Sequence, residues 1–160
     1  MHQKLMFAVS VFVAAVAFAE EPELKPAQEE AKEQFQESVG KALKTLNEKC
    51  GTKINAVQSD FHNFKSEDWS GMAFYSWCDP VVEGIAALCD RPAYKKAIAK
   101  KLTGVQCLFA GVKPKQKEDG SNEGTLRNMS FEKGQFIFRM SKESANVSDN
   151  AKAVMEKALN

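Results

Sequence analysis

The sequence predicts an α+β domain, in which a small antiparallel sheet of three to four strands packs against helices and two disulfides add cross-links. Three observations lead to this class. Several segments carry apolar residues at helical spacing, two neighbouring segments alternate apolar and polar residues around a glycine-containing turn, and four cysteines follow a presumed export signal. The expected order is helix, strand, two helices, three strands and a last helix, with no internal repeat.

Residues 1–19 have the features of a signal peptide. A short polar start containing Lys4 precedes an apolar run from Leu5 to Val16, and Ala17-Phe18-Ala19 matches an A-x-A cleavage site. The apolar run is shorter than the roughly 20 residues that span a bilayer, which makes a membrane anchor the weaker interpretation. We expect cleavage after Ala19 and a secreted or periplasmic protein with no membrane span.

The mature chain is formally neutral. Cleavage removes Lys4 and leaves 21 basic and 21 acidic residues in about 141 positions, a length that suits one domain. A neutral chain lacks the positive charge that nucleic-acid binding requires, so nucleic acid is not an expected partner. Residues 20–26 are acidic and contain two prolines, which predicts a flexible lead-in before a single domain over residues 27–160.

The four cysteines predict two structural disulfides. They are separated by 27, 10 and 17 residues, and no C-x-x-C pair or C-x-x-C-H sequence occurs. This spacing does not fit a zinc site, a haem attachment or a thioredoxin-like redox pair, and we expect no metal and no cofactor. A polar run over residues 113–124 also fails to match a calcium-binding loop.

The predicted helix between two of the cysteines restricts their pairing. A helix over residues 78–89 separates its ends by on the order of 15 Å, whereas bonded cysteines require Cα atoms within about 7 Å. Two arrangements remain. We favour Cys50 with Cys89 and Cys78 with Cys107, because a helix returning along the first strand brings Cys89 back toward Cys50. Cys50 with Cys78 and Cys89 with Cys107 stays open.

Apolar spacing predicts the elements of the first half of the domain. An amphipathic helix begins at Ala27 and ends at Cys50-Gly51, where glycine suits the left-handed conformation just past a helix end. Residues 52–58 alternate weakly and predict a first strand. Asp79-Pro80 has the composition of a helix start, and a second helix follows over residues 93–102.

The 93–102 helix carries four lysines on one side: Lys95, Lys96, Lys100 and Lys101. These lysines could form a basic face for an anionic partner. The neutrality of the whole chain favours a solvated helix face instead.

The pattern of residues in the second half of the domain predicts three further strands and a last helix. Residues 105–112 form a buried strand in this interpretation, and the polar run over 113–124 forms an exposed loop. Residues 125–131 and 135–140 then make a hairpin around Glu132-Lys133-Gly134. A last helix begins near Ser148 and presents an apolar stripe.

Aromatic residues are concentrated between residues 61 and 77, which hold six of the mature chain's twelve. A large-residue core is the simpler explanation. The alternative is a partly open surface for a ligand, with Trp69, Tyr75 and Trp77 as contact residues, because tryptophan and tyrosine combine apolar bulk with a polar tip. The 113–124 loop is a second candidate contact surface.

Catalytic motifs are weak. His62 is the only histidine after cleavage, and Asp60 and Asn63 could orient it, yet no G-x-S-x-G or phosphate-binding loop accompanies it. Acid pairs such as Asp79 and Glu83 are common by chance. Two N-glycosylation sequons begin at Asn128 and Asn146, which matter only in a eukaryotic secretory route.

The sequence therefore predicts a disulfide-stabilised binding protein outside the cytoplasm. Its expected partner is an unidentified protein, peptide or cell-envelope component. Two alternatives remain, namely an envelope hydrolase that uses carboxylates with or without His62, and a structural subunit of an oligomer.

Overall fold

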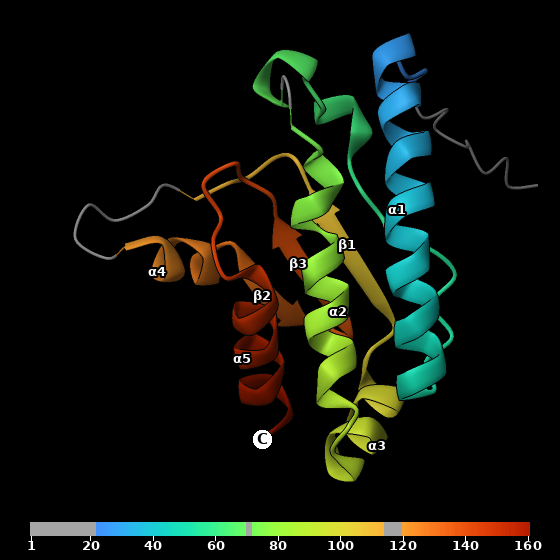
Figure 1. Cartoon of the computed structure of the whole chain (residues 1–160), viewed down its shortest axis with the longest axis vertical. Helices are drawn as coiled ribbons and strands as arrows, with labels where there is room; N and C mark the ends of the chain where they lie inside the picture. Colours follow the sequence, from blue (N-terminus) through green and yellow to red (C-terminus); the bar gives the residue numbers. More distant parts are fainter. Residues whose placement is uncertain (1–21, 70–71, 114–119) are drawn as a thin grey trace, which may run out of the picture.

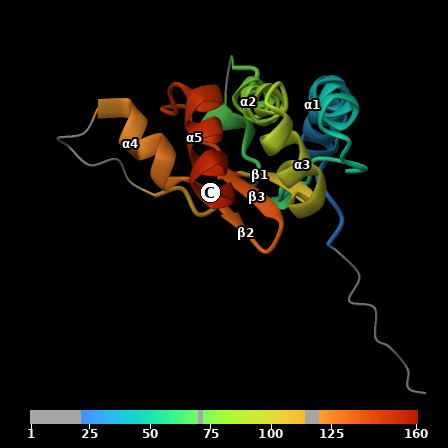
Figure 2. The same ribbon diagram turned by 90° about the horizontal axis from the view of Figure 1, so that it is seen from below.

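A computed structural model describes residues 22–69, 72–113 and 120–160, and the signal peptide predicted over residues 1–19 lies outside them. Helices and sheet form two layers. The long helices α1 (Pro26–Cys50), α2 (Asp79–Leu88) and α5 (Val147–Leu159) lie on the same side of a three-stranded sheet, and α3 (Pro92–Lys101) lies at one end of it (Figures 1 and 2). This arrangement confirms the predicted α+β class.

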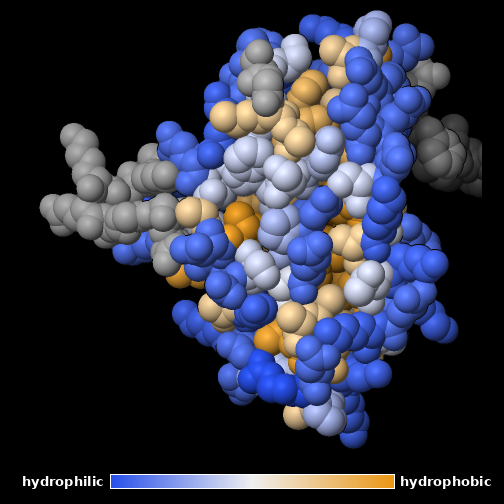
Figure 3. Space-filling model, viewed as in Figure 1, coloured by the Kyte–Doolittle hydropathy of each residue, from blue (hydrophilic) through white to orange (hydrophobic). Residues whose placement is uncertain are grey.

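Helix α1 follows the predicted apolar spacing. Its buried residues recur every three or four positions from Ala31 to Cys50 and face α2, while charged residues cover the outer side (Figure 3). The helix ends at Gly51, whose φ of 73° is the left-handed conformation that glycine adopts without steric cost. The sequence predicted both ends to within one residue.

Helix α2 is packed on two sides. Val81, Val82 and Ile85 are fully buried between the layers. A Cβ built on Gly84 would lie 2.4 Å from the backbone oxygen of Ser148 at the start of α5. Glycine is therefore required where these two helices cross.

The sheet is mixed, which corrects the antiparallel sheet expected from the sequence. Strands β1 (Gly104–Leu108), β3 (Gln135–Arg139) and β2 (Met129–Glu132) lie in that order. β2 and β3 form the predicted antiparallel hairpin, but β1 pairs with β3 in parallel. The hairpin adds to β1 through its second strand, and hydrophobic alternation carries no information about that choice.

The hairpin turn consists of two residues. Lys133 and Gly134 connect β2 to β3, and both have positive φ, 51° and 82°. Two-residue turns of this kind match the twist of the flanking strands. Glycine fits the conformation, whereas lysine is an unusual residue for it.

The expected strand over residues 52–58 is wrong except for a single bridge between Gln58 and Gln106. The side chain of Asn47 explains the difference. Its oxygen accepts the N–H of Ile54 at 3.1 Å and its amide donates to the carbonyl of Ile54 at 2.8 Å. A side chain thus satisfies backbone groups that a neighbouring strand would otherwise use.

The strand expected over residues 105–112 ends early for a similar reason. Beyond Leu108, the carboxylate of Asp60 accepts the N–H groups of Phe109 at 2.6 Å and Ala110 at 3.2 Å. Gly111 then turns the chain with a φ of 78°. The Asp60 side chain replaces a strand partner, and the ladder stops.

Helix α4 (Gly120–Arg127) was not predicted, and it corrects two expectations. It occupies the end of the expected 113–124 loop, of which residues 114–119 lie outside the described residues. It also delays the first strand of the expected hairpin from residue 125 to Met129. The sequence does not predict this helix because it contains glycine at positions 120 and 124, and glycine is a poor helix former. Helix α5 also starts at Val147, one residue before the expected cap.

Both preferred disulfides are present. Cys50 is bonded to Cys89 with their Cα atoms 5.3 Å apart, and Cys78 to Cys107 with their Cα atoms 6.0 Å apart. The first joins the ends of α1 and α2, and the second joins the start of α2 to β1. All four cysteines are buried.

Candidate binding site

The segment from Phe61 to Trp77 folds without a regular helix or strand longer than one turn. It contains three short 3-10 helices, η1 (Phe61–Asn63), η2 (Ser66–Trp69) and η3 (Phe74–Trp77), with residues 70–71 outside the described part. Its place in the fold is set by an aromatic cluster, whose members are Phe35, Phe61, Phe64, Trp69, Phe74 and Phe109.

Phe109 lies at the centre of the aromatic cluster. Its ring centroid is 5.3 Å from that of Phe64, 5.6 Å from that of Phe74 and 6.0 Å from that of Trp69. These edge-to-face and tilted contacts are the favoured geometries of aromatic pairs. Most of the aromatic concentration in the sequence is therefore core.

The three predicted contact residues separate into one buried and two partly exposed side chains. Trp69 is 8% exposed and belongs to the aromatic cluster. Tyr75 is half-buried and lines a hollow beside α1, whereas Trp77 is half-buried and lines a groove beside α5. Trp77 packs edge-on against Trp69, with ring centroids 5.4 Å apart.

The groove beside Trp77 is the most specific candidate site. It has a volume of about 490 Å³ and is lined by Ser76, Trp77, Pro80, Ser144, Asn146, Val147, Ser148 and Asp149. Its wall combines an indole, a proline ring and a valine with small polar side chains. Within the described residues, the indole N–H of Trp77 has no hydrogen-bond partner and can donate to a ligand.

This groove joins elements that are distant in the sequence. Trp77 and Pro80 come from η3 and the start of α2, while the polar side of the groove comes from the start of α5. The close crossing of α2 and α5 at Gly84 fixes the two halves together. The sequence indicates Trp77 as a contact residue but does not reveal the α5 residues beside it, because only the helix crossing brings them together.

The carboxylate of Asp60 binds other groups and is not available to orient the side chain of His62. Both carboxylate oxygens of Asp60 are engaged, one by the N–H of Phe109 and the other by Ala110 and by the Asn63 amide at 2.9 Å. The exposed His62 contributes its backbone carbonyl to a hydrogen bond from the Gln28 amide, at 3.0 Å. The side chains of Asp60 and Gln28 thus stabilise the backbone conformation around His62.

Asp79, at the start of α2, is a partly buried carboxylate. Partial burial raises the pKa of Asp79, and a hydrogen bond from the Ser38 hydroxyl at 2.7 Å opposes that rise. Its other oxygen, Oδ1, is buried and has no partner in the described structure. Glu83, its proposed partner in an acid pair, is exposed.

The described residues contain no group of three or more histidine, cysteine, aspartate or glutamate side chains that could hold a metal ion. Among the helices of this same part of the chain, none is both long and apolar enough to cross a membrane. The large apolar side chains most exposed in it are Met72 and Val112.

The two sequons differ in accessibility. Asn128 is 3% exposed; its side-chain oxygen accepts the N–H of Lys113 at 2.6 Å and its amide donates to the carbonyl of Gly124 at 3.1 Å. Asn146 is exposed and precedes α5 with a positive φ of 50°. Asn128 is thus a buried structural residue that connects α4 to the chain after β1.

Comparisons with protein-family models, with curated proteins and with solved structures found no match to this chain.

Proposed function

We propose that this protein is an exported, disulfide-stabilised binding protein that captures a protein or peptide segment in the groove beside Trp77. The main support for this proposal is the position of Trp77. Its ring is half-exposed at the wall of a groove of about 490 Å³ and is supported from behind by buried Trp69. A rigid aromatic residue in a partly open groove is the usual anchor point of a protein interface.

The composition of the groove supports a peptide rather than a small cofactor. Pro80 and Val147 add apolar surface next to the indole, and Ser148 and Asp149 add polar groups along one side. The groove is open, so an extended or helical segment can lie across it. Two disulfides fit a location outside the cytoplasm, where thiols oxidise.

The test uses the oxidised mature chain and a displayed peptide library. A Trp69→Phe variant keeps an aromatic ring in the core and leaves Trp77 as the only tryptophan, so the fluorescence of that variant reports on the groove. We expect selected peptides to change this fluorescence. Trp77→Ala should weaken their binding by roughly 30-fold, as for a hot-spot residue worth about 2 kcal/mol.

Tyr94→Ala is the matched control. Tyr94 is also a half-buried aromatic, but it lies on α3, where it stacks under Arg91 at 4.0 Å. Selected peptides should bind this variant within about twofold of wild type. Peptides that bind Trp77→Ala and wild type equally, or a selection that yields no binder, would contradict the proposal.

A further inference from the structure

We propose that α3 and the adjoining hairpin turn form a binding surface for a linear sulfated polysaccharide. The surface, termed here the lysine patch, consists of Lys95, Lys96, Lys100, Lys101 and Lys133. The five side chains are on exposed residues. The proposal shares with the proposed function only the location of the protein outside the cytoplasm, and it does not depend on the groove beside Trp77.

Tertiary structure adds Lys133 to the lysines of α3. The backbone N–H of Thr103, just after α3, donates to the carbonyl of Gly134 at 2.8 Å. A Cβ on Gly134 would lie 3.0 Å from the backbone oxygen of Lys101. The hairpin turn therefore touches the end of α3, and Lys133 adds a further positive charge at that end.

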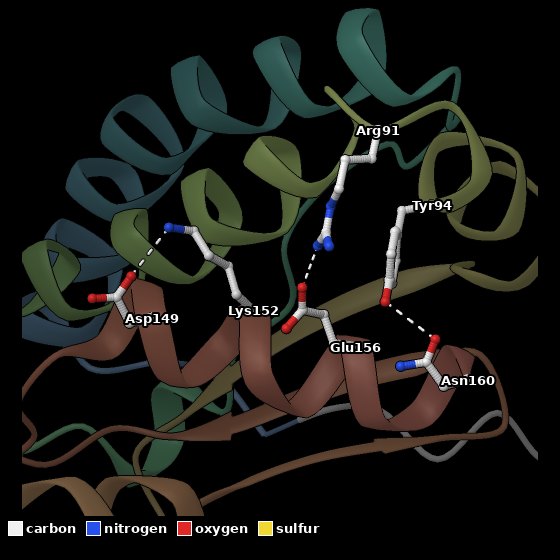
Figure 4. A network of polar contacts seen from close by, with 6 residues as sticks. All are labelled: Arg91, Tyr94, Asp149, Lys152, Glu156 and Asn160. Atoms are coloured by element: carbon white, nitrogen blue, oxygen red, sulfur yellow. Dashed lines mark hydrogen bonds and ion pairs between the residues drawn. The ribbon is translucent and has the colours of Figure 1, made fainter.

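The nearby carboxylates are occupied by other partners. Asp90 binds Lys49 at 2.9 Å, and Glu156 binds Arg91, which also lies over Tyr94 (Figure 4). None of the five patch lysines forms an ion pair within the described residues. Exposed Glu132, next to Lys133 in sequence, offsets one of the charges.

Charge is separated along the molecule even though the mature chain is neutral. The first half of α1, at the opposite end from α3 in Figure 1, carries Glu29, Glu30, Glu33 and Glu37 against Lys32 alone. Exposed Glu67 and Asp68 of η2 lie at that same acidic end. Neutrality of the whole chain therefore does not make the lysine patch neutral, and a polarised molecule presents its basic end to a polyanion.

The backbone of Lys133 is the second, independent observation. It has a φ of 51° in a turn where asparagine, aspartate or glycine is favoured. A lysine in this conformation is unfavourable for folding, because its Cβ crowds the backbone. Its presence is explained if the charge is needed at that position.

The chemistry of the patch favours a soluble polyanion over the other anionic partners. The apolar residues of α3 point inward, since Ile98 is fully buried and Tyr94 half-buried, so the helix offers no apolar face for insertion into a membrane. The patch also contains neither arginine nor an exposed aromatic residue, which nucleic-acid sites use for base contacts. Exposed lysine ammonium groups are flexible point charges, which can each bind a sulfate along a linear chain without a fixed planar geometry.

The experiment measures binding of the oxidised mature chain to heparin, with desulfated heparin and anionic phospholipid vesicles as parallel probes. Wild type should bind heparin with an affinity that falls steeply with salt, and should bind the other two probes at least tenfold more weakly. The patch variant is Lys96→Gln, Lys100→Gln and Lys133→Gly combined. It should lose at least about tenfold in heparin affinity.

The control variant combines Lys41→Gln, Lys65→Gln and Lys142→Gln, which removes the same charge from exposed lysines outside the patch. It should lose less than about twofold. Trp77→Ala should bind heparin as wild type does, which separates this surface from the groove. Lys133→Gly alone should raise Tm while weakening heparin binding, because glycine suits the turn.

Four results would overturn the proposal. Equal losses in the patch and control variants would mean that only net charge matters. Equal binding of heparin and desulfated heparin would remove the role of sulfate. Tighter binding to vesicles than to heparin would assign the patch to a membrane surface, and no binding to any probe would leave the lysines as a solvated helix face.

Discussion

The aromatic segment from Phe61 to Trp77 and the helical layer of α1, α2 and α5 are stabilised in different ways. The helices satisfy their own backbone groups and bury one apolar side each. The aromatic segment makes only single turns, and its position depends on rings that pack on Phe109 and on the disulfide from Cys78 to Cys107. A few large side chains thus replace a regular hydrogen-bond pattern.

This difference matters because the proposed peptide groove lies where the two regions meet. Trp77 ends the aromatic segment, and Val147 begins α5. The helical side of the groove is fixed by backbone contact, whereas the aromatic side is fixed by side-chain packing. Damage to the aromatic cluster should therefore affect the groove before it affects the helices.

Removal of a central ring should have the largest effect. Phe74 is 4% exposed and contacts Phe64, Trp69 and Phe109. Phe74→Ala should lower the free energy of unfolding by about 3–5 kcal/mol. Hydrogen exchange should show the greatest loss of protection in residues 61–77, while α1 and α2 keep theirs.

Met72→Ala is the control for this variant. Met72 lies in the same segment but is 47% exposed, so its loss should change stability by no more than about 0.5 kcal/mol. A uniform loss of protection across the whole chain in Phe74→Ala would show that the two regions unfold as one unit.

Two glycine substitutions test the helical layer. Gly84→Ala places a methyl group against the backbone of Ser148, and it should lower stability by about 1–3 kcal/mol through separation of α2 and α5. Gly40→Ala, on the exposed side of α1, meets no atom within 4 Å and should raise stability by up to about 1 kcal/mol. Thermal unfolding measures the change in Tm of each variant. A change of the same sign in both variants would contradict the close crossing of α2 and α5.

Asp79 joins α2 to α1 through Ser38, and its replacement should give the smallest effect. Because burial raises its pKa in the folded state above the ordinary aspartate value of 3.8, the folded protein binds a proton more readily than the unfolded chain. Stability from this group therefore increases as pH falls toward that value. Asp79→Asn should unfold at a higher temperature than wild type at neutral pH, and the difference should shrink as the pH is lowered.

The matched control is Asp149→Asn, which replaces an exposed acid in the first turn of α5. It should show no such gain at neutral pH. A difference between wild type and Asp79→Asn that stays constant between about pH 7 and pH 4 would show that burial of Asp79 does not affect its protonation.

The sequence predicted helices better than strands for a physical reason. An apolar stripe such as Ala31 to Cys50 in α1 encodes which side is buried, whatever the helix packs against. Residues 52–58 have some strand character, but their backbone groups were taken by Asn47, and the end of β1 was set by Asp60. No local pattern reveals that a distant polar side chain will replace a strand partner.

For the candidate site, the sequence identified residue types and not their grouping. It selected Trp69, Tyr75 and Trp77 together, whereas the fold puts the first in the core and places the other two in separate hollows. The sequence also shows the four lysines of α3, but the net charge of the whole chain gives no sign that they form a local basic surface. The position of Lys133 near these lysines depends on the contact between the hairpin turn and the end of α3.

By itself, the sequence determined the α+β class, the helical segments other than α4, the hairpin and the exclusion of a bond between Cys78 and Cys89. These follow from short-range periodicity, from turn chemistry and from the length of a helix. The tertiary structure alone decided the parallel pairing of β1 with β3, the groove at Trp77 and the lysine patch. Each of these depends on contacts between residues far apart in the chain, and such contacts are fixed by packing of the whole core rather than by any local pattern.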